Sequence, residues 1–69
     1  MIRNRIREHR ARLGMKQEDL ARLVGVRRET IGNLENGRYN PSLKLAMDIA
    51  KVFDTTVEDI FFFFDESAS

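Results

Sequence analysis

The sequence VRRETIGNLENG runs from Val26 to Gly37, and its apolar residues recur at helical spacing. Ile31 and Leu34 fall on one side of this helix, and the opposite side carries polar side chains and Gly32. Because glycine in a helix interior costs roughly 1 kcal/mol, a helix built only for stability would not place it there. We therefore expect the outer side of this helix to contact a polar, anionic partner.

Length and composition exclude several classes of protein. The 69 residues make one small domain, with no cysteine and a single histidine. Disulfides and thiolate metal sites are therefore excluded, and no hydrolase, metalloprotease or phosphate-loop motif is present. We therefore expect that the protein is not an enzyme and has no catalytic residue. We also expect that it binds no metal, no other cofactor and no small-molecule ligand.

The chain shows no signal peptide, and its longest apolar run, Ile60 to Phe64, is far shorter than the roughly 20 residues that span a bilayer. These features predict a soluble cytoplasmic protein.

Charge is distributed unevenly although the net charge is only +1. Residues 1–38 hold ten Arg or Lys against five Asp or Glu, a balance of +5. Residues 39–69 hold two against six, a balance of −4. This pattern predicts a basic face for an anionic partner and an acidic end held away from it. A solvated surface of mixed charge is the alternative.

Apolar spacing and cap residues predict five short helices, over residues 2–13, Gln17 to Val24, Arg28 to Asn36, Ser42 to Phe53 and Val57 to Ile60. Ser42 and Thr56 are the expected caps of the last two. Leu23 and Leu43 are expected to face inward, and His9 to be partly buried and hydrogen-bonded. Gly25 joins the second and third helices by a sharp turn, which is the signature of a helix-turn-helix unit.

Five spaced motifs carry a family resemblance: Gln17-Glu18-Asp19-Leu20-Ala21, Val24-Gly25-Val26, Thr30-Ile31, Leu34-Glu35-Asn36-Gly37 and Asn40-Pro41-Ser42-Leu43. Together they resemble the Cro/C1-type (Xre-family) helix-turn-helix repressors, from about Ile6 to Phe61. The short, single-domain, cytolysin-repressor-like members are the most similar. The resemblance implies an all-α, five-helix lambda-repressor-like domain over residues 1–61, with the third helix in the DNA major groove.

The resemblance places Arg28, Glu29 and Asn33 at base edges. The fork of Arg28 suits guanine, the amide of Asn33 suits adenine, and Glu29 can accept a hydrogen bond from cytosine. Glu29 could equally hold Arg28 in place, or be an acid favoured at a helix N-terminus. The full set of expected DNA-binding residues is Gln17, Arg27, Arg28, Glu29, Gly32, Asn33, Asn36, Arg38 and Asn40.

Within that set, the resemblance places Gln17 in contact with a DNA phosphate and Asn36 near the DNA backbone. Arg27 and Arg38 are better suited to phosphates than to bases. Asn40 could reach the backbone or simply order its loop, and Gly32 would allow close approach to DNA. Arg10 and Glu35 match a structural ion pair between the first and third helices.

Two departures from the family pattern concern helix caps. Lys16 and Arg27 stand where Ser or Thr usually caps the second and third helices, and losing such a cap costs about 1 kcal/mol. Each replacement adds a positive charge near the expected DNA backbone. In addition, His9 replaces a common Leu and Asp54 a common Gly.

The phenylalanines Phe61, Phe62, Phe63 and Phe64 cannot all be buried in so small a domain, because alternate residues of an extended segment face opposite ways. We expect residues 61–66 to be a dimerisation segment, with the phenylalanines pairing across a two-fold axis as short β-strands, and 67–69 to be a disordered tail. The alternative is a frayed tail folded over its own core.

These features predict a sequence-specific, double-stranded DNA-binding transcriptional regulator, a repressor that reads a palindromic operator as a homodimer. The alternative is an antitoxin or other protein-interaction module that neutralises a partner protein and binds DNA for autoregulation.

Overall fold

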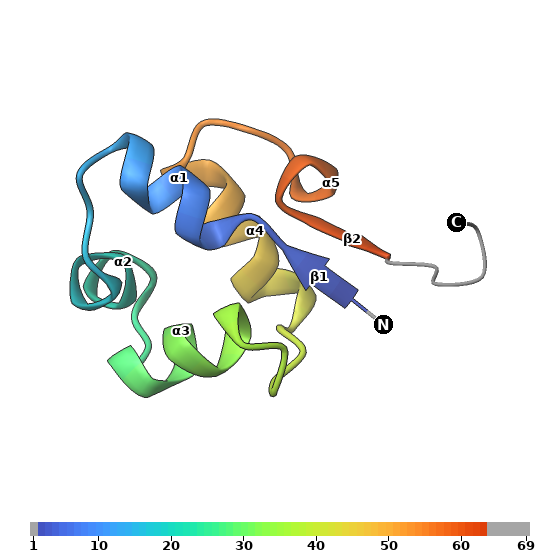
Figure 1. The fold of residues 1–69 in the computed structure, drawn as a ribbon, viewed down its shortest axis with the longest axis horizontal. Helices are drawn as coiled ribbons and strands as arrows, with labels where there is room; N and C mark the ends of the chain where they lie inside the picture. The colour runs from blue at the N-terminus through green and yellow to red at the C-terminus, as the bar shows by residue number, and fades with distance from the viewer. Residues whose placement is uncertain (1, 64–69) are drawn as a thin grey trace.

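Five helices and a two-stranded antiparallel sheet make up residues 2–63, the part of the chain that the computed structural model describes (Figure 1). In chain order they are β1 (Ile2–Asn4), α1 (Ile6–Arg12), α2 (Gln17–Val24), α3 (Arg28–Glu35), α4 (Leu43–Val52), α5 (Val57–Ile60) and β2 (Phe61–Phe63). The five predicted helices are therefore confirmed. No helix in this part of the chain is both long and apolar enough to cross a membrane.

A single apolar cluster joins all five helices. Its most deeply buried side chains are Ile6, Leu20, Ile31, Leu34, Ile49 and Ile60. Two predicted core residues are wrong: Leu23 is 61% exposed and Leu43 is 73% exposed. The buried stripe of α4 begins at Leu45 instead, and Leu23 lies about 200° around α2 from the buried Ala21.

The first helix begins later than predicted, at Ile6 instead of residue 2. Residues 2–4 form β1, which pairs with β2 in the register Ile2↔Phe63, Arg3↔Phe62 and Asn4↔Phe61. Helical spacing near the N-terminus cannot reveal a partner that lies at the other end of the chain, so the strand was missed.

The predicted strand over the phenylalanines is present in Phe61–Phe63, and within the chain it has a partner that was not predicted. Phe61–Phe63 pair with β1 of the same chain, and the guanidinium of Arg5 lies 4.3 Å from the centre of the Phe62 ring. Phe61 packs against the core, and Phe63 is 81% exposed. Phe64, the rest of segment 61–66 and tail 67–69 lie outside the described residues. Pairing between two copies stays a prediction.

Helix ends follow the capping signals. The hydroxyl groups of Ser42 and Thr56 accept hydrogen bonds from the third residue after each, as predicted. At the end of α4, Asp54 takes the left-handed conformation, with φ +55°, at a position where glycine is preferred. An aspartate tolerates this conformation better than most residues, so the helix still ends there.

His9 is mostly buried and hydrogen-bonded, as predicted. Its ring stacks on Phe53 with centroids 5.1 Å apart. Nδ1 lies 3.1 Å from Arg12 Nη2, which can only donate, so Nδ1 accepts and Nε2–H donates to Asp59 Oδ2 at 3.1 Å. These contacts attach α1 to α4 and α5.

Candidate nucleic-acid interface

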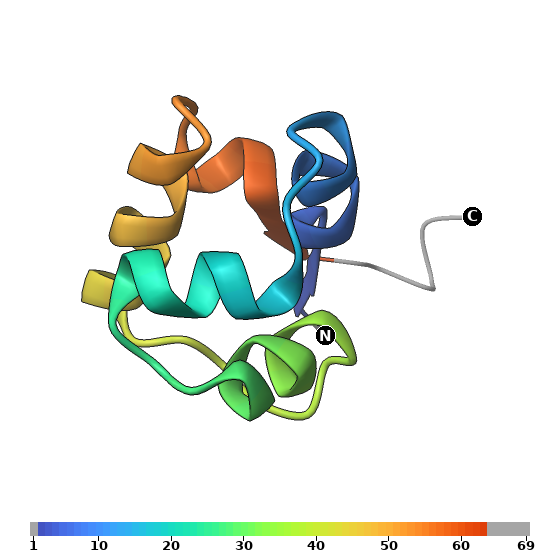
Figure 2. The same ribbon diagram turned by 90° about the vertical axis from the view of Figure 1, so that its left-hand side faces the viewer.

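Helix α3 has one buried face and one open face. Ile31 and Leu34 point into the core, while Arg28, Glu29 and Asn33 are exposed. Both ribbon views place α3 at one edge of the molecule, with α5 well away from it (Figures 1 and 2). The exposed polar face of α3 is therefore directed away from the rest of the fold.

The uneven distribution of charge along the sequence is also present in the folded structure. Exposed Arg27, Arg28 and Arg38 lie at α3 and its two ends. Exposed Asp54 and Glu58 lie at the end of α4 and on α5, on the far side of the molecule. A polyanion approaching α3 would meet the cations and avoid these carboxylates.

The turn between α2 and α3 sets the position of α3. Gly25 ends α2 in the left-handed conformation, with φ +74°, and the Val26 N–H donates to the Ala21 carbonyl at 3.0 Å. Arg27 then precedes α3 in extended geometry, and its side chain caps nothing. Helices α2 and α3 pack directly against each other across this turn.

A buried ion pair attaches the C-terminal end of α3 to α1. Glu35 Oε2 lies 2.6 Å from Arg10 Nε, and Glu35 Oε1 lies 3.0 Å from Arg10 Nη2. The Glu35 side chain is 1% exposed and that of Arg10 14% exposed. The Arg10–Glu35 contact therefore matches the predicted ion pair between the first and third helices.

The same carboxylate has two further partners that the sequence did not indicate. Gln17 Nε2 donates to Glu35 Oε1 at 3.0 Å, and Arg7 Nε lies 3.4 Å from the same oxygen. Burial raises the pKa of Glu35, but hydrogen bonds from Arg10 and Gln17 and the nearby arginine charges outweigh it and lower the pKa below its ordinary value. Glu35 is thus a satisfied, ionised group that joins α1, α2 and α3.

Gln17 lies between Glu35 and Arg28. Since a carboxylate can only accept, the amide nitrogen of Gln17 faces Glu35, and its oxygen faces Arg28 Nη1 at 3.5 Å. Among residues 2–63, Arg28 makes no ion pair with Glu29, so the option in which Glu29 holds Arg28 gains no support. A Cβ on Gly32 would lie 3.8 Å from Gln17 Oε1, an ordinary contact distance.

The remaining predicted residues lie at the C-terminal end of α3. Asn36 ends the helix, and Arg38 and Asn40 lie in the loop that follows; all three are exposed. Gly37 reverses the chain there with φ +74°, while the Arg38 N–H donates to the Asn33 carbonyl at 2.8 Å. The structure thus brings the predicted positions to one side of the molecule, centred on α3.

Comparison with known proteins gives a consistent family. A helix-turn-helix family model matches residues 6–60. An HTH-type transcriptional regulator of Archaeoglobus fulgidus is 63% identical over 65 residues, covering 94% of this chain and 93% of that protein. The HTH-type transcriptional regulator YgzD of Bacillus subtilis is 44% identical over 66 residues, covering 96% and 100%.

Among solved structures, the restriction-modification controller protein C.AhdI of Aeromonas hydrophila superposes with a TM-score of 0.73 at 35% identity, covering 78% of this chain and 82% of that one. The fold is that of a lambda-repressor-like helix-turn-helix domain. On its sequence and its fold, the chain belongs to the Xre/Cro-type family of helix-turn-helix transcriptional regulators.

Proposed function

We propose that this protein binds double-stranded DNA through the outer face of α3 and represses transcription as a homodimer on an inverted-repeat operator. The observation that carries the proposal is the face itself. Arg28, Glu29 and Asn33 are exposed side by side on a helix whose other face is anchored in the core. Such a protein would act in the cytoplasm, on the nucleoid.

The exposed side chains have complementary tasks in this proposal. Arg28 donates to guanine, Asn33 pairs with adenine, and Glu29 accepts from cytosine. Arg27 and Arg38 neutralise phosphates at the two ends of α3, with Asn36 and Asn40 beside the backbone. The Gln17 amide donates to Glu35, and its second N–H is available to a phosphate.

The dimer would form through the end of the molecule that carries the sheet. β1 and β2 are three residues each, so the two-stranded sheet satisfies few backbone groups by itself. Phe63 is 81% exposed, and burying it against a second copy would remove a large apolar side chain from water. A two-fold dimer places two copies of α3 about 34 Å apart, one turn of DNA.

Selection of binding sites from random duplex DNA tests two parts of the proposal together: sequence-specific binding and the two-fold symmetry of the bound site. We expect an enriched inverted repeat, whose half-sites are separated by about one helical turn. An enriched single half-site would contradict the paired reading, and no enrichment would contradict sequence-specific binding altogether.

Sedimentation at micromolar concentration tests the dimer directly. We expect the wild-type chain to sediment as a dimer and Phe63→Ser to shift it toward the monomer. A wild-type monomer that Phe63→Ser leaves unchanged would contradict dimerisation through this end.

Arg28→Ala tests the reading helix on the selected sequence. We expect a loss of about 1–3 kcal/mol of binding free energy on that sequence and far less on random DNA, because a bidentate base contact is lost. An equal loss on both DNAs would show that Arg28 contacts a phosphate.

A further inference from the structure

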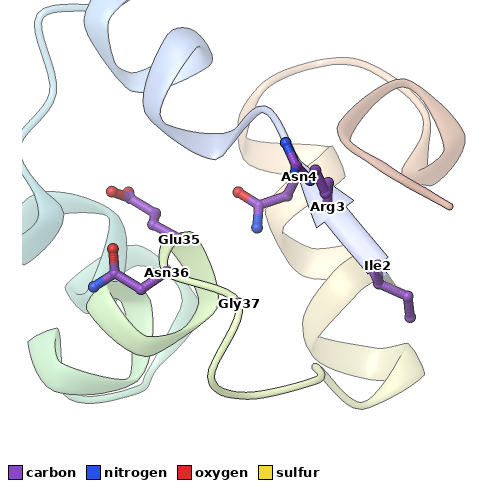
Figure 3. A pocket seen from close by; sticks show the side chains of 6 residues that line it. All are labelled: Ile2, Arg3, Asn4, Glu35, Asn36 and Gly37. Carbon is purple, nitrogen blue, oxygen red and sulfur yellow. The ribbon is translucent and has the colours of Figure 1, made fainter. Parts of the chain in front are cut away.

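Asn4, in β1, is linked to three other elements of the fold. Its backbone lies in β1 opposite Phe61 of β2, its Oδ1 accepts the Ile6 N–H of α1 at 3.2 Å, and its Nδ2 donates to the Leu34 carbonyl of α3 at 2.8 Å. Figure 3 shows the Asn4 side chain directed toward the end of α3. It borders a hollow of about 310 Å³ between β1 and that helix end.

The two ends of the Asn4 amide are fixed by chemistry. A carbonyl oxygen can only accept and a backbone N–H can only donate, so Nδ2 must face Leu34 and Oδ1 must face Ile6. Leu34 carries one of the last four carbonyls of α3, which have no partner within the helix. That carbonyl also accepts from the Gly37 N–H at 3.1 Å. The Asn4 side chain is therefore hydrogen-bonded to the C-terminal end of α3, at the point where the chain leaves the helix.

The sheet is attached to the rest of the fold separately, through α5. The Arg5 N–H donates to the Ile60 carbonyl at 2.8 Å, and Arg5 Nη1 donates to the Asp59 carbonyl at 3.0 Å. Loss of the Asn4–Leu34 bond would thus leave the sheet in place but loosen its orientation relative to α3.

We propose that Asn4 is a positioning residue that sets the operator spacing the dimer accepts. The inference rests on the proposed function: the sheet end joins two copies, and α3 of each copy reads a half-site. Changing the separation of half-sites by one base pair moves one of them by about 3.4 Å and rotates it by about 36°. A rigid link between sheet and α3 makes the dimer intolerant of that change.

Two substitutions separate the roles of the Asn4 side chain. Asn4→Asp keeps an oxygen for the Ile6 N–H but places a second oxygen against the Leu34 carbonyl, so only the link to α3 is lost. Asn4→Ala removes both bonds. Val52→Ala, a half-buried position on α4, is the control for a general loss of stability.

The test measures affinity on the selected inverted repeat, on versions with one base pair added or removed, and on a single half-site. We expect the wild type and Val52→Ala to bind the altered spacings more weakly than the selected one. In Asn4→Asp and Asn4→Ala this penalty, taken as the ratio of two affinities of the same variant, shrinks about fivefold, the factor that one hydrogen bond corresponds to. Half-site affinity, measured for each variant, separates this change from any effect on the contacts of α3 itself.

Hydrogen exchange gives a second readout that needs no DNA. The amides of Gly37 and Arg38 close the end of α3, and we expect them to exchange faster in Asn4→Asp than in the wild type, with amides of α4 unchanged. A spacing penalty in Asn4→Asp equal to that of Val52→Ala would overturn the proposed role of Asn4 but would leave the proposed dimer on DNA standing. A wild type without any spacing preference would overturn the paired reading and this role with it.

Discussion

The carboxylate of Glu35 accepts two hydrogen bonds from the guanidinium of Arg10, at 2.6 Å and 3.0 Å, across 25 residues of sequence. Both side chains are largely out of solvent, and Gln17 adds a third bond to the same carboxylate. The end of α3 is therefore held by a buried carboxylate whose charge these partners compensate.

Removing one member of this pair leaves a buried charge without its main partner. We expect Arg10→Met to lower the free energy of unfolding by about 3 kcal/mol, measured by urea denaturation. Arg7→Met is the matched control, because Arg7 meets the same carboxylate from an exposed position and should cost less than about 1 kcal/mol. Equal losses in the two variants would contradict a special role for Arg10.

Stability should also depend on pH through Glu35. Its folded-state pKa is lower than the ordinary value of 4.5, so the unfolded chain takes up a proton more readily. The stabilisation is therefore fully present above 4.5 and is lost as the pH falls through the folded-state pKa. Urea midpoints recorded from neutral to acid pH should fall less steeply in Glu35→Gln than in the wild type. Glu58→Gln, exposed on α5, should keep the wild-type slope.

Much of this architecture could be predicted from local sequence signals. The turn at Gly25 and the caps at Ser42 and Thr56 each depend on residues within a few positions, and the structure has them as predicted. The Arg10–Glu35 pair spans 25 residues, and the sequence indicated it only through the family resemblance.

What was missed depends on contacts between distant parts of the chain. Residues 2–4 were assigned to the first helix because strand β1 exists only through its pairing with β2. The amide of Asn4 reaches Leu34, 30 residues away, and nothing near Asn4 announces that partner. The positions of Leu23 and Leu43 depend on the rotation of each helix about its axis, which a short apolar pattern does not fix.

Gly32 lies on the outer face of α3, and replacing it with alanine tests whether DNA contacts this face. The free energy of unfolding should rise by about 0.5–1 kcal/mol in Gly32→Ala, because alanine favours the helix and the added Cβ meets Gln17 at an ordinary distance. If DNA approaches this face closely, affinity should fall in the same variant. Thermal unfolding and operator binding measured together separate the two effects; unchanged affinity would show that Gly32 does not lie at the contact.

Arg27 offers the sharpest separation of stability from binding. Its side chain leaves the start of α3 uncapped, so Arg27→Ser should raise the free energy of unfolding by about 1 kcal/mol. The same change removes an exposed charge beside the proposed DNA backbone from each subunit of the proposed dimer. Affinity for the inverted repeat should therefore fall, and the slope of log affinity against log salt should become shallower by about 2.

Arg27→Ala is the matched control for this pair of effects, since it removes the charge without supplying a cap. We expect it to weaken DNA binding as much as Arg27→Ser does while gaining none of the stability. Equal stability in the serine and alanine variants would mean that no capping bond forms at this position. A salt slope that neither variant changes would place Arg27 away from the phosphates, and the charge at the start of α3 would then need another explanation.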